Sequence, residues 1–262
     1  MASFFASLAA RLLALTTATA PVAPVGDAPP VVPASSVVDV VETPRLAAAE
    51  PAEKAAPPVD DVTPVVDRLQ KTYESTTDFS ARFTQRYTFM ALKKTQESSG
   101  TVVFQKPGRM RWDYAAPTKK SFVVANGKLH VVQPEDNTAL IDHCFKEDGL
   151  TASVSFLWGS GRIREEFDVT RFGGVFGEKT DHHLLLVPKA KNGVFAKIIL
   201  VVDPISFRVK QSVVVDPQGN VNQFLFEGAK FNAGVKPDVF DVKLPSTMAV
   251  SRMPGSCDPN AR

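Results

Sequence analysis

A strict alternation of side-chain character between Gly100 and Gly127 constrains the fold of this chain more than any other feature. Large apolar residues alternate there with charged ones: Met110, Trp112 and Tyr114 against Arg109, Arg111 and Asp113. Because successive side chains of a β-strand point to opposite faces, this pattern predicts a sheet with an aromatic inner face. Both arginines and the aspartate are then expected to face water.

Composition divides the 262-residue chain into four segments. Residues 1–20 contain a short apolar stretch that ends in small residues, which is typical of an export signal peptide; the alternative is the amphipathic or disordered N-terminus of a cytosolic protein. Residues 21–60 hold nine prolines and no aromatic residue, a composition that predicts a disordered Pro/Ala-rich linker. Residues 61–250 are predicted to form one β domain, and residues 251–262 a C-terminal tail.

The domain is expected to begin with one amphipathic helix. Thr63-Pro64 predicts an N-cap followed by proline at the first helical position, and the apolar residues around it recur at helical spacing: Val62, Val65, Val66, Leu69 and Tyr73. A long strand with one polar face is predicted from Phe79 to Phe89. Residues 92–99 are predicted to be a polar link to the next strand.

Turn signals and alternating segments predict a meander of strands after this link. Asn126-Gly127 is a strong hairpin signal, because both residues tolerate positive φ. Apolar residues at helical spacing predict a short helix inserted within 150–158, which would plug or cover the sheet: Leu150, Val154, Leu157 and Trp158. Strands are expected to resume at Phe167, giving a mainly β domain of about eleven antiparallel strands.

The inner face of the first half of the chain carries unusually large and soft side chains: Phe83, Tyr87, Phe89, Phe104, Met110, Trp112 and Phe122. Methionine and aromatic residues suit an irregular cavity that accepts variable apolar guests. The second half is filled by Val, Leu and Ile instead. An ordinary β-sandwich core would give the same alternation, so the residues alone leave both interpretations open.

The sequence contains no pattern of catalytic or metal-ligating residues. The adjacent His182 and His183 would point to opposite faces of a strand and could not share an ion. Ser160 lies between two glycines without the strand-to-helix context of a nucleophile elbow, and no phosphate-binding loop is present. We therefore expect neither an enzyme nor a cofactor, and the net charge of +2 argues against a nucleic-acid partner.

Two cysteines, Cys144 and Cys257, are too few for a disulfide-rich scaffold. In an oxidising compartment they could pair and hold the C-terminal tail against the sheet. They could equally remain unpaired, because the sequence does not give the distance between their Cα atoms.

Several motifs in this order and spacing resemble the periplasmic outer-membrane lipoprotein carrier family of the LolA type. The resemblance covers about residues 62–250. It rests on the following segments: F-x-x-x-F-x-Q at 79–85, Gly100, K-P-G-R-M-R-W at 106–112, Pro117, V-A-N-G-K at 124–128, F-L-W-G at 156–159, L-V-P-K at 186–189 and the segment 240–244.

The resemblance implies an incomplete, open antiparallel β-barrel with helices as a lid over a hydrophobic cavity. It also implies a monomeric periplasmic chaperone that takes triacylated lipoproteins from an inner-membrane ABC transporter to an outer-membrane acceptor. The residues expected to line its acyl-chain cavity are Phe83, Tyr87, Phe104, Met110, Trp112, Tyr114, Phe122, Val124, Leu129, Val154, Leu157 and Trp158.

One departure from the resembled family concerns the latch of the lid. Some members carry an arginine before the turn proline, where it bonds the lid shut, and this chain has Lys106 there. Lysine is a point donor without the guanidinium fork. Either Lys106 closes the lid more weakly, or Arg109 or Arg111 takes over this role.

A different class of protein also fits the sequence. A tethered lipid-binding receptor or envelope-stress sensor could use a similar half-barrel, with residues 21–60 as its tether. An outer-membrane acceptor would instead need a lipobox cysteine just after its signal peptide, and no cysteine precedes Cys144.

Overall fold

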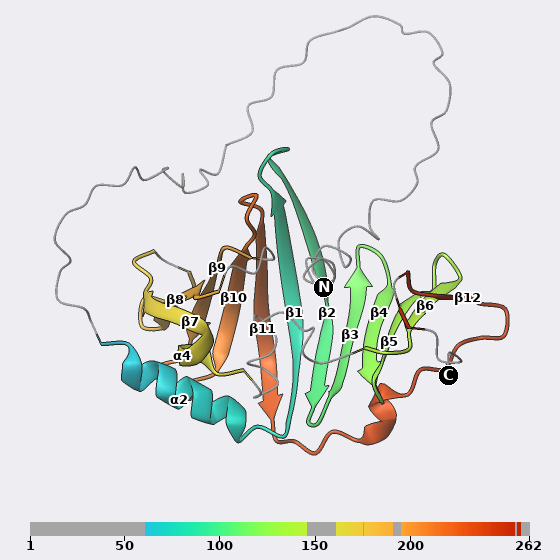
Figure 1. Ribbon diagram of the computed structural model, residues 1–262, viewed down its shortest axis with the longest axis horizontal. Coiled ribbons are helices and arrows are strands. Elements are labelled where there is room, and N and C mark those ends of the chain that lie inside the picture. Colours follow the sequence, from blue (N-terminus) through green and yellow to red (C-terminus); the bar gives the residue numbers. More distant parts are fainter. Residues whose placement is uncertain (1–60, 146–160, 175, 191–194, 255, 258–262) are drawn as a thin grey trace, which may run out of the picture.

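The computed structural model describes residues 61–145, 161–174, 176–190, 195–254 and 256–257. The segments predicted as signal peptide and linker, and the helix predicted within 150–158, lie outside these residues. The described residues form one curved sheet with short helical segments at its ends (Figure 1).

The sheet has twelve strands in the order β12-β6-β5-β4-β3-β2-β1-β11-β10-β9-β8-β7. Two meanders, β1 to β6 and β7 to β11, meet where β1 pairs with β11. Their strands are β1 (Asp78–Phe89), β2 (Lys94–Gln105), β3 (Arg109–Ala116), β4 (Lys120–Ala125), β5 (Lys128–Gln133), β6 (Thr138–Asp142), β7 (Phe167–Arg171), β8 (His182–Pro188), β9 (Lys197–Val202), β10 (Val209–Val215), β11 (Val221–Phe231) and β12 (Ala249–Arg252).

The prediction of a mainly β, open sheet is confirmed, since β7 and β12 lie at opposite ends of the strand order. Strands β1 to β11 match the expected eleven antiparallel strands, and one further strand is added to them. There are twelve strands among the described residues, and β12 pairs with β6 in parallel rather than antiparallel. Sequence reasoning missed β12 because four exposed residues carry no alternation.

The first helix, α2 (Thr63–Glu74), covers part of the inner face, which we define as the face that bears Trp112. Its buried stripe joins the same core as the inner-face aromatic residues. The Tyr73 hydroxyl also accepts a hydrogen bond from the Val209 backbone N–H at 3.1 Å. The prediction of Thr63 as N-cap is wrong by one position: Val62 occupies it, and the Asp61 carboxylate accepts the Thr63 N–H at 3.0 Å.

Strands β1 and β2 form a long hairpin that rises above its neighbours (Figure 1). The polar link predicted at 92–99 is wrong from Lys94 onward, because β2 begins there. Polar pairs hold this part of the ladder: the Thr88 and Thr95 hydroxyls lie 3.0 Å apart, and Arg86 meets Glu97 at 2.9 Å. Both faces of the hairpin are solvated there, so the apolar alternation that marks a half-buried strand is missing.

Two glycines allow the aromatic residues to share the inner face. A Cβ at Gly100 would lie 2.0 Å from the Asp113 carbonyl oxygen and 3.0 Å from the Phe83 ring, so only glycine fits under that ring. Gly228, at φ 61°, lies where β11 carries one extra residue opposite β1. This bulge reverses the alternation, so that Phe226 and Phe231 point to the same face.

The segment after β11 runs along the outer face and includes a 3₁₀ turn, η3 (Pro237–Phe240), against β3 and β4. The Arg111 guanidinium donates to the Val239 carbonyl at 2.9 Å and to the Asp113 carboxylate at 2.6 Å. The expectation that Arg111 and Asp113 face water is therefore wrong. They lie half-buried beneath a C-terminal segment whose position the local pattern could not predict.

Candidate functional site

The candidate site is an aromatic cluster on the inner face, built from the central strands. We call it the aromatic face, and it comprises Phe79, Phe83, Phe104, Trp112, Tyr114, Phe122, Phe224, Phe226 and Phe231. Adjacent strands bring these rings into register, since Phe83 pairs with Gly100 on one side and Phe226 on the other. Neighbouring rings meet mainly edge to face, the arrangement that aromatic quadrupoles favour.

Trp112 lies at the centre of the aromatic face. Its ring centroid is 4.9 Å from Phe83, 5.3 Å from Phe224 and 6.0 Å from Phe104. Trp112 and Phe224 are half-buried, whereas Phe83, Phe104 and Tyr114 are buried. The centre of the face therefore keeps apolar surface that a guest can reach.

The structure brings most of the predicted cavity residues together. Seven are buried in the core of the inner face: Phe83, Phe104, Met110, Tyr114, Phe122, Val124 and Leu129. Trp112 packs against them, while the half-buried Tyr87 lies farther along β1 and stacks edge-on with Phe89 at 4.5 Å. Val154, Leu157 and Trp158 lie outside the described residues.

Sequence reasoning missed the aromatic residues that β11 contributes. Phe224 and Phe226 belong to the second half of the chain, yet β11 pairs with β1 and places them beside Phe83 and Trp112. The F-x-F spacing was a usable signal for one sheet face. The pairing of strands more than a hundred residues apart could not be predicted, because no local sequence pattern encodes it.

Two buried polar groups interrupt the aromatic face at its β3–β4 side. The Lys120 ammonium lies 4.6 Å from the centroid of the Tyr114 ring, and burial lowers the pKa of this lysine. The Tyr114 hydroxyl is buried without a hydrogen-bond partner among the described residues, and burial raises the pKa of this phenol. The wall at this point is therefore amphipathic.

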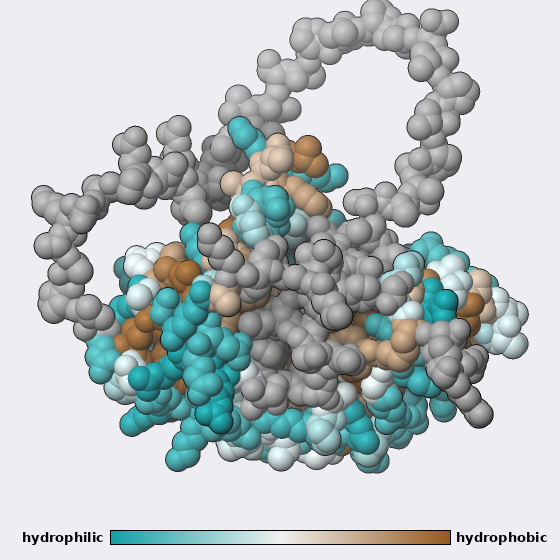
Figure 2. All heavy atoms as spheres, viewed as in Figure 1, coloured by the Kyte–Doolittle hydropathy of each residue, from teal (hydrophilic) through white to brown (hydrophobic). Residues whose placement is uncertain are grey.

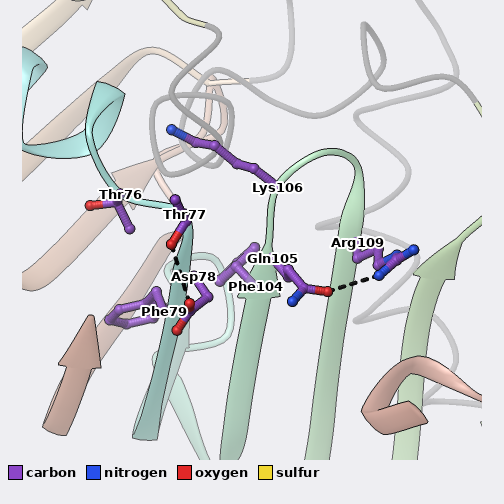
Figure 3. Close-up of a pocket in the computed structure, with 8 residues that line it drawn as sticks. All are labelled: Thr76, Thr77, Asp78, Phe79, Phe104, Gln105, Lys106 and Arg109. Carbon is purple, nitrogen blue, oxygen red and sulfur yellow. Dashed lines mark hydrogen bonds between the residues drawn. The ribbon is translucent and has the colours of Figure 1, made fainter. Parts of the chain in front are cut away.

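Lys106 holds the end of the covering helix. Its ammonium donates to the Tyr73 carbonyl at 2.6 Å and to the Glu74 carbonyl at 3.1 Å, two backbone acceptors in the last turn of α2. Figure 3 shows the side chain reaching from the β2–β3 turn toward this helix. Burial lowers the pKa of Lys106, and the Glu74 charge opposes this shift.

The two arginines proposed as alternative latches lie elsewhere. Arg109 donates to the Gln105 side chain at 2.9 Å, and Gln105 donates in turn to the Val235 carbonyl at 2.6 Å. Arg111 holds Val239, as described above. Both arginines thus support the segment on the outer face, whereas Lys106 contacts a helix on the inner face.

A small pocket lies between the end of α2 and the first two strands (Figure 3). Its lining residues are Thr76, Thr77, Asp78, Phe79, Phe104, Gln105, Lys106 and Arg109. The buried Asp78 carboxylate closes one side by accepting the backbone N–H groups of Ala233 at 2.8 Å and Gly234 at 3.1 Å. Lys106 on one side of the pocket thus contacts α2, and Asp78 on the other contacts the C-terminal segment.

The structure joins Cys144 and Cys257 in a disulfide, with their Cα atoms 5.8 Å apart. Beside it, the Ser256 hydroxyl donates to the Asp142 carboxylate at 2.7 Å. These contacts fasten the chain after β12 to the end of β6.

An open, curved sheet with a reachable aromatic inner face and a covering amphipathic helix defines a class of apolar-ligand binding protein. The family model "Outer membrane lipoprotein carrier protein LolA" matches residues 74–243. The chain belongs to this family. Among the described residues, no helix combines the length and apolar character needed to cross a membrane.

Individual relatives are distant. The outer-membrane lipoprotein carrier protein of Azotobacter vinelandii is 27% identical over 204 residues, covering 76% of this chain and 89% of that protein. That of Pseudomonas syringae pv. tomato is 26% identical over 185 residues, covering 69% and 84%. An uncharacterized conserved protein from Thermus thermophilus has a solved structure with a TM-score of 0.48 and 14% identity, covering 73% of this chain and 99% of that one.

Proposed function

We propose that this protein is a periplasmic carrier that binds the acyl chains of lipoproteins released from the inner membrane and delivers them to the outer membrane. Family membership supports this proposal, and the observation that carries it is the half-buried pair Trp112 and Phe224 at the centre of the aromatic face. The partners would be triacylated lipoproteins, a lipoprotein-releasing ABC transporter and an outer-membrane acceptor. The protein itself would act as a monomer without covalent chemistry.

Simple energetics explain why such a carrier is needed. At about 0.8 kcal/mol per buried CH₂, an acyl chain of roughly fourteen methylenes costs on the order of 11 kcal/mol to expose to water. Three such chains require an apolar wall throughout their transfer. Edge-to-face aromatic rings and Met110 can adjust to different chains without a fixed fit, which favours release as well as binding.

Lys106 would connect the aromatic face to α2, the helix that covers part of it. It holds the last carbonyls of α2 through a single ammonium group. A lysine makes fewer directed bonds there than an arginine could. We expect α2 to separate from the strands more readily than it would with a forked donor, so that acyl chains can enter and leave.

The proposal is tested by titrating the full chain with a fluorescent fatty acid and with a purified triacylated lipoprotein. Phe224→Glu places a charge on the aromatic face and is expected to weaken binding of both ligands at least tenfold. Leu225→Glu is the matched control, because this neighbour lies on the opposite face of β11 and is already 37% exposed. The affinity of the Leu225→Glu variant for both ligands should equal that of the wild type.

Equal weakening by both variants would place the binding site away from the aromatic face. Binding of the fatty acid without the lipoprotein would instead favour the lipid-binding receptor or stress sensor. Sequencing the N-terminus of the mature protein separates these cases further, since a carrier must be released from its signal peptide.

A further inference from the structure

The tip of the β1–β2 hairpin presents apolar side chains to solvent. Met90 is 47% and Leu92 72% exposed, and the exposed Ala91 lies between them. Figure 2 shows hydrophobic and hydrophilic side chains gathered on this projection. Lys93 and Lys94 follow directly and are also exposed, and the segment 89–95 contains no acidic residue.

The hairpin projects well beyond the next strand. Strand β2 pairs with β3 only from Ser99 onward, so Lys94–Ser98 have a neighbour on the β1 side alone. Five residues at about 3.3 Å each correspond to roughly 16 Å of unaccompanied strand. This distance separates the tip from β3, whereas on its other side β1 stays paired with β11 as far as Thr88 (Figure 1).

The projecting tip is braced by the adjacent β10–β11 turn. The Met90 N–H donates to the Asn220 side-chain oxygen at 3.1 Å. Asn220 is held in turn by Asp216, which accepts its backbone N–H and its amide N–H, both at 2.8 Å. The tip therefore has a defined position although its own side chains have little to pack against.

Turn formation does not explain this choice of residues. Lys93 adopts φ 48°, a conformation that glycine or asparagine would take at lower cost. Contact with water does not stabilise the exposed leucine and methionine side chains. An apolar tip followed by lysines matches instead the interface of a bilayer, where apolar groups enter the acyl region and lysines meet anionic headgroups.

We infer that the β1–β2 tip is a membrane-contact site that inserts Met90 and Leu92 into a bilayer containing anionic phospholipid, with Lys93 and Lys94 at the headgroups. The inner face of β1 leads to this tip through Phe83, Tyr87 and Phe89. The contact does not depend on acyl-chain binding, so the two proposals can fail separately.

The inference is tested with the full chain and vesicles of phosphatidylcholine, with and without an equal part of phosphatidylglycerol. Leu92→Trp should show a blue shift of its added emission with the anionic vesicles. The matched control is Ile205→Trp in the β9–β10 turn, because Ile205 is 88% exposed but lies at the other end of β10 from Asn220. It should show no shift.

Cosedimentation supplies a second measurement. Leu92→Asp should weaken binding to the anionic vesicles at least tenfold relative to wild type, and Ile205→Asp should not. Replacing Lys93 and Lys94 together with Gln should remove the preference for phosphatidylglycerol. Unshifted emission of Leu92→Trp, or equal losses for the two aspartate variants, would overturn the inference. Titration of each variant with the fluorescent fatty acid reports the acyl-chain site independently.

Discussion

The two wings of the sheet, the aliphatic wing of β8 to β10 and the aromatic wing of β11 and β1 to β6, meet different physical requirements. In the aliphatic wing, β8 to β10, branched side chains are buried on both faces; Leu200 and Val201 are adjacent residues that point in opposite directions, and both are 0% exposed. At the centre of the aromatic face, Trp112 and Phe224 remain half-buried, while Leu225 on the outer face is 37% exposed. The comparison suggests that one wing supplies stability and the other supplies adaptable binding surface.

The sealing of the aliphatic wing has a visible cause. The segment before β8 folds back over the outer face, where the His183 ring contacts the Phe176 carbonyl oxygen. Lys210 on β10 binds the buried Asp181 carboxylate at 3.1 Å. On the aromatic part of the sheet, the C-terminal segment that includes η3 covers the outer face of β3 and β4, and the surface that a guest can reach lies on the inner face.

The largest effect that would test this division is expected for Leu200→Ala. Removing a fully buried leucine leaves a cavity, so the free energy of unfolding should fall by about 3 kcal/mol in urea titrations. Val187→Ala on β8 is the control, because Val187 is 42% exposed and should change stability by less than about 0.5 kcal/mol. Fatty-acid affinity of the folded variant should stay unchanged; a parallel loss of affinity would contradict the separation of the wings.

A somewhat smaller effect is expected for Gly100→Ala beneath the aromatic face. The new Cβ would meet a backbone carbonyl that cannot move aside without displacing β3, so stability should fall by about 2 kcal/mol. Fatty-acid affinity should fall too, since Phe83 must shift. Gly173→Ala is the matched control, because a Cβ there meets nothing within 4 Å. Equal stabilities of the two variants would show that the close approach at Gly100 is not a constraint.

The aromatic side of this comparison was largely predictable from local pattern. Alternation placed Met110, Trp112 and Tyr114 on one face, and Asn126-Gly127 formed the expected turn, with φ 53° and 68°. These features depend on the period of a strand and on turn chemistry, both of which are written in consecutive residues.

What could not be predicted depends on long-range pairing. The β1–β11 ladder brings Phe224 to Trp112, and β12 joins β6 in parallel from a segment expected to end the domain as a tail. The outer-face roles of Arg109 and Arg111 follow from a C-terminal segment more than a hundred residues away. Neither charge pattern nor periodicity specifies such partners.

Lys106→Met tests whether Lys106 holds α2 over the aromatic face independently of the packing of the core. Losing two charge-assisted bonds to the end of α2 should lower stability by about 1.5 kcal/mol. It should also speed dissociation of a bound fatty-acid probe in stopped-flow displacement. Lys106→Arg keeps a donor and should retain slow dissociation, whereas unchanged dissociation in Lys106→Met would remove Lys106 from the latch.

The smallest effect expected concerns a histidine on each wing and depends on pH. Burial, followed by the charges of Lys128 and His143, lowers the pKa of His130 in the folded protein. Burial and Arg171 likewise lower the pKa of His182. In both cases the unfolded chain binds the proton more readily than the folded one.

Stability should therefore be fully present above the unfolded histidine pKa of about 6.5 and should decline as the pH falls below it. His130→Gln and His182→Gln should each lose less stability than wild type between about pH 7.5 and about pH 5.5, because glutamine does not titrate there. Urea titrations at both values measure this difference, in which the carboxylates common to all three proteins cancel. Lys128 and His143 add to the lowering of the His130 pKa, and the backbone hydrogen bond with Val123 opposes it. At His182, the charges of Asp181 and Asp203 oppose the lowering by Arg171 and His183, so the larger change is expected for His130. A larger change for His182 would mean that burial in the sealed aliphatic wing outweighs local charge.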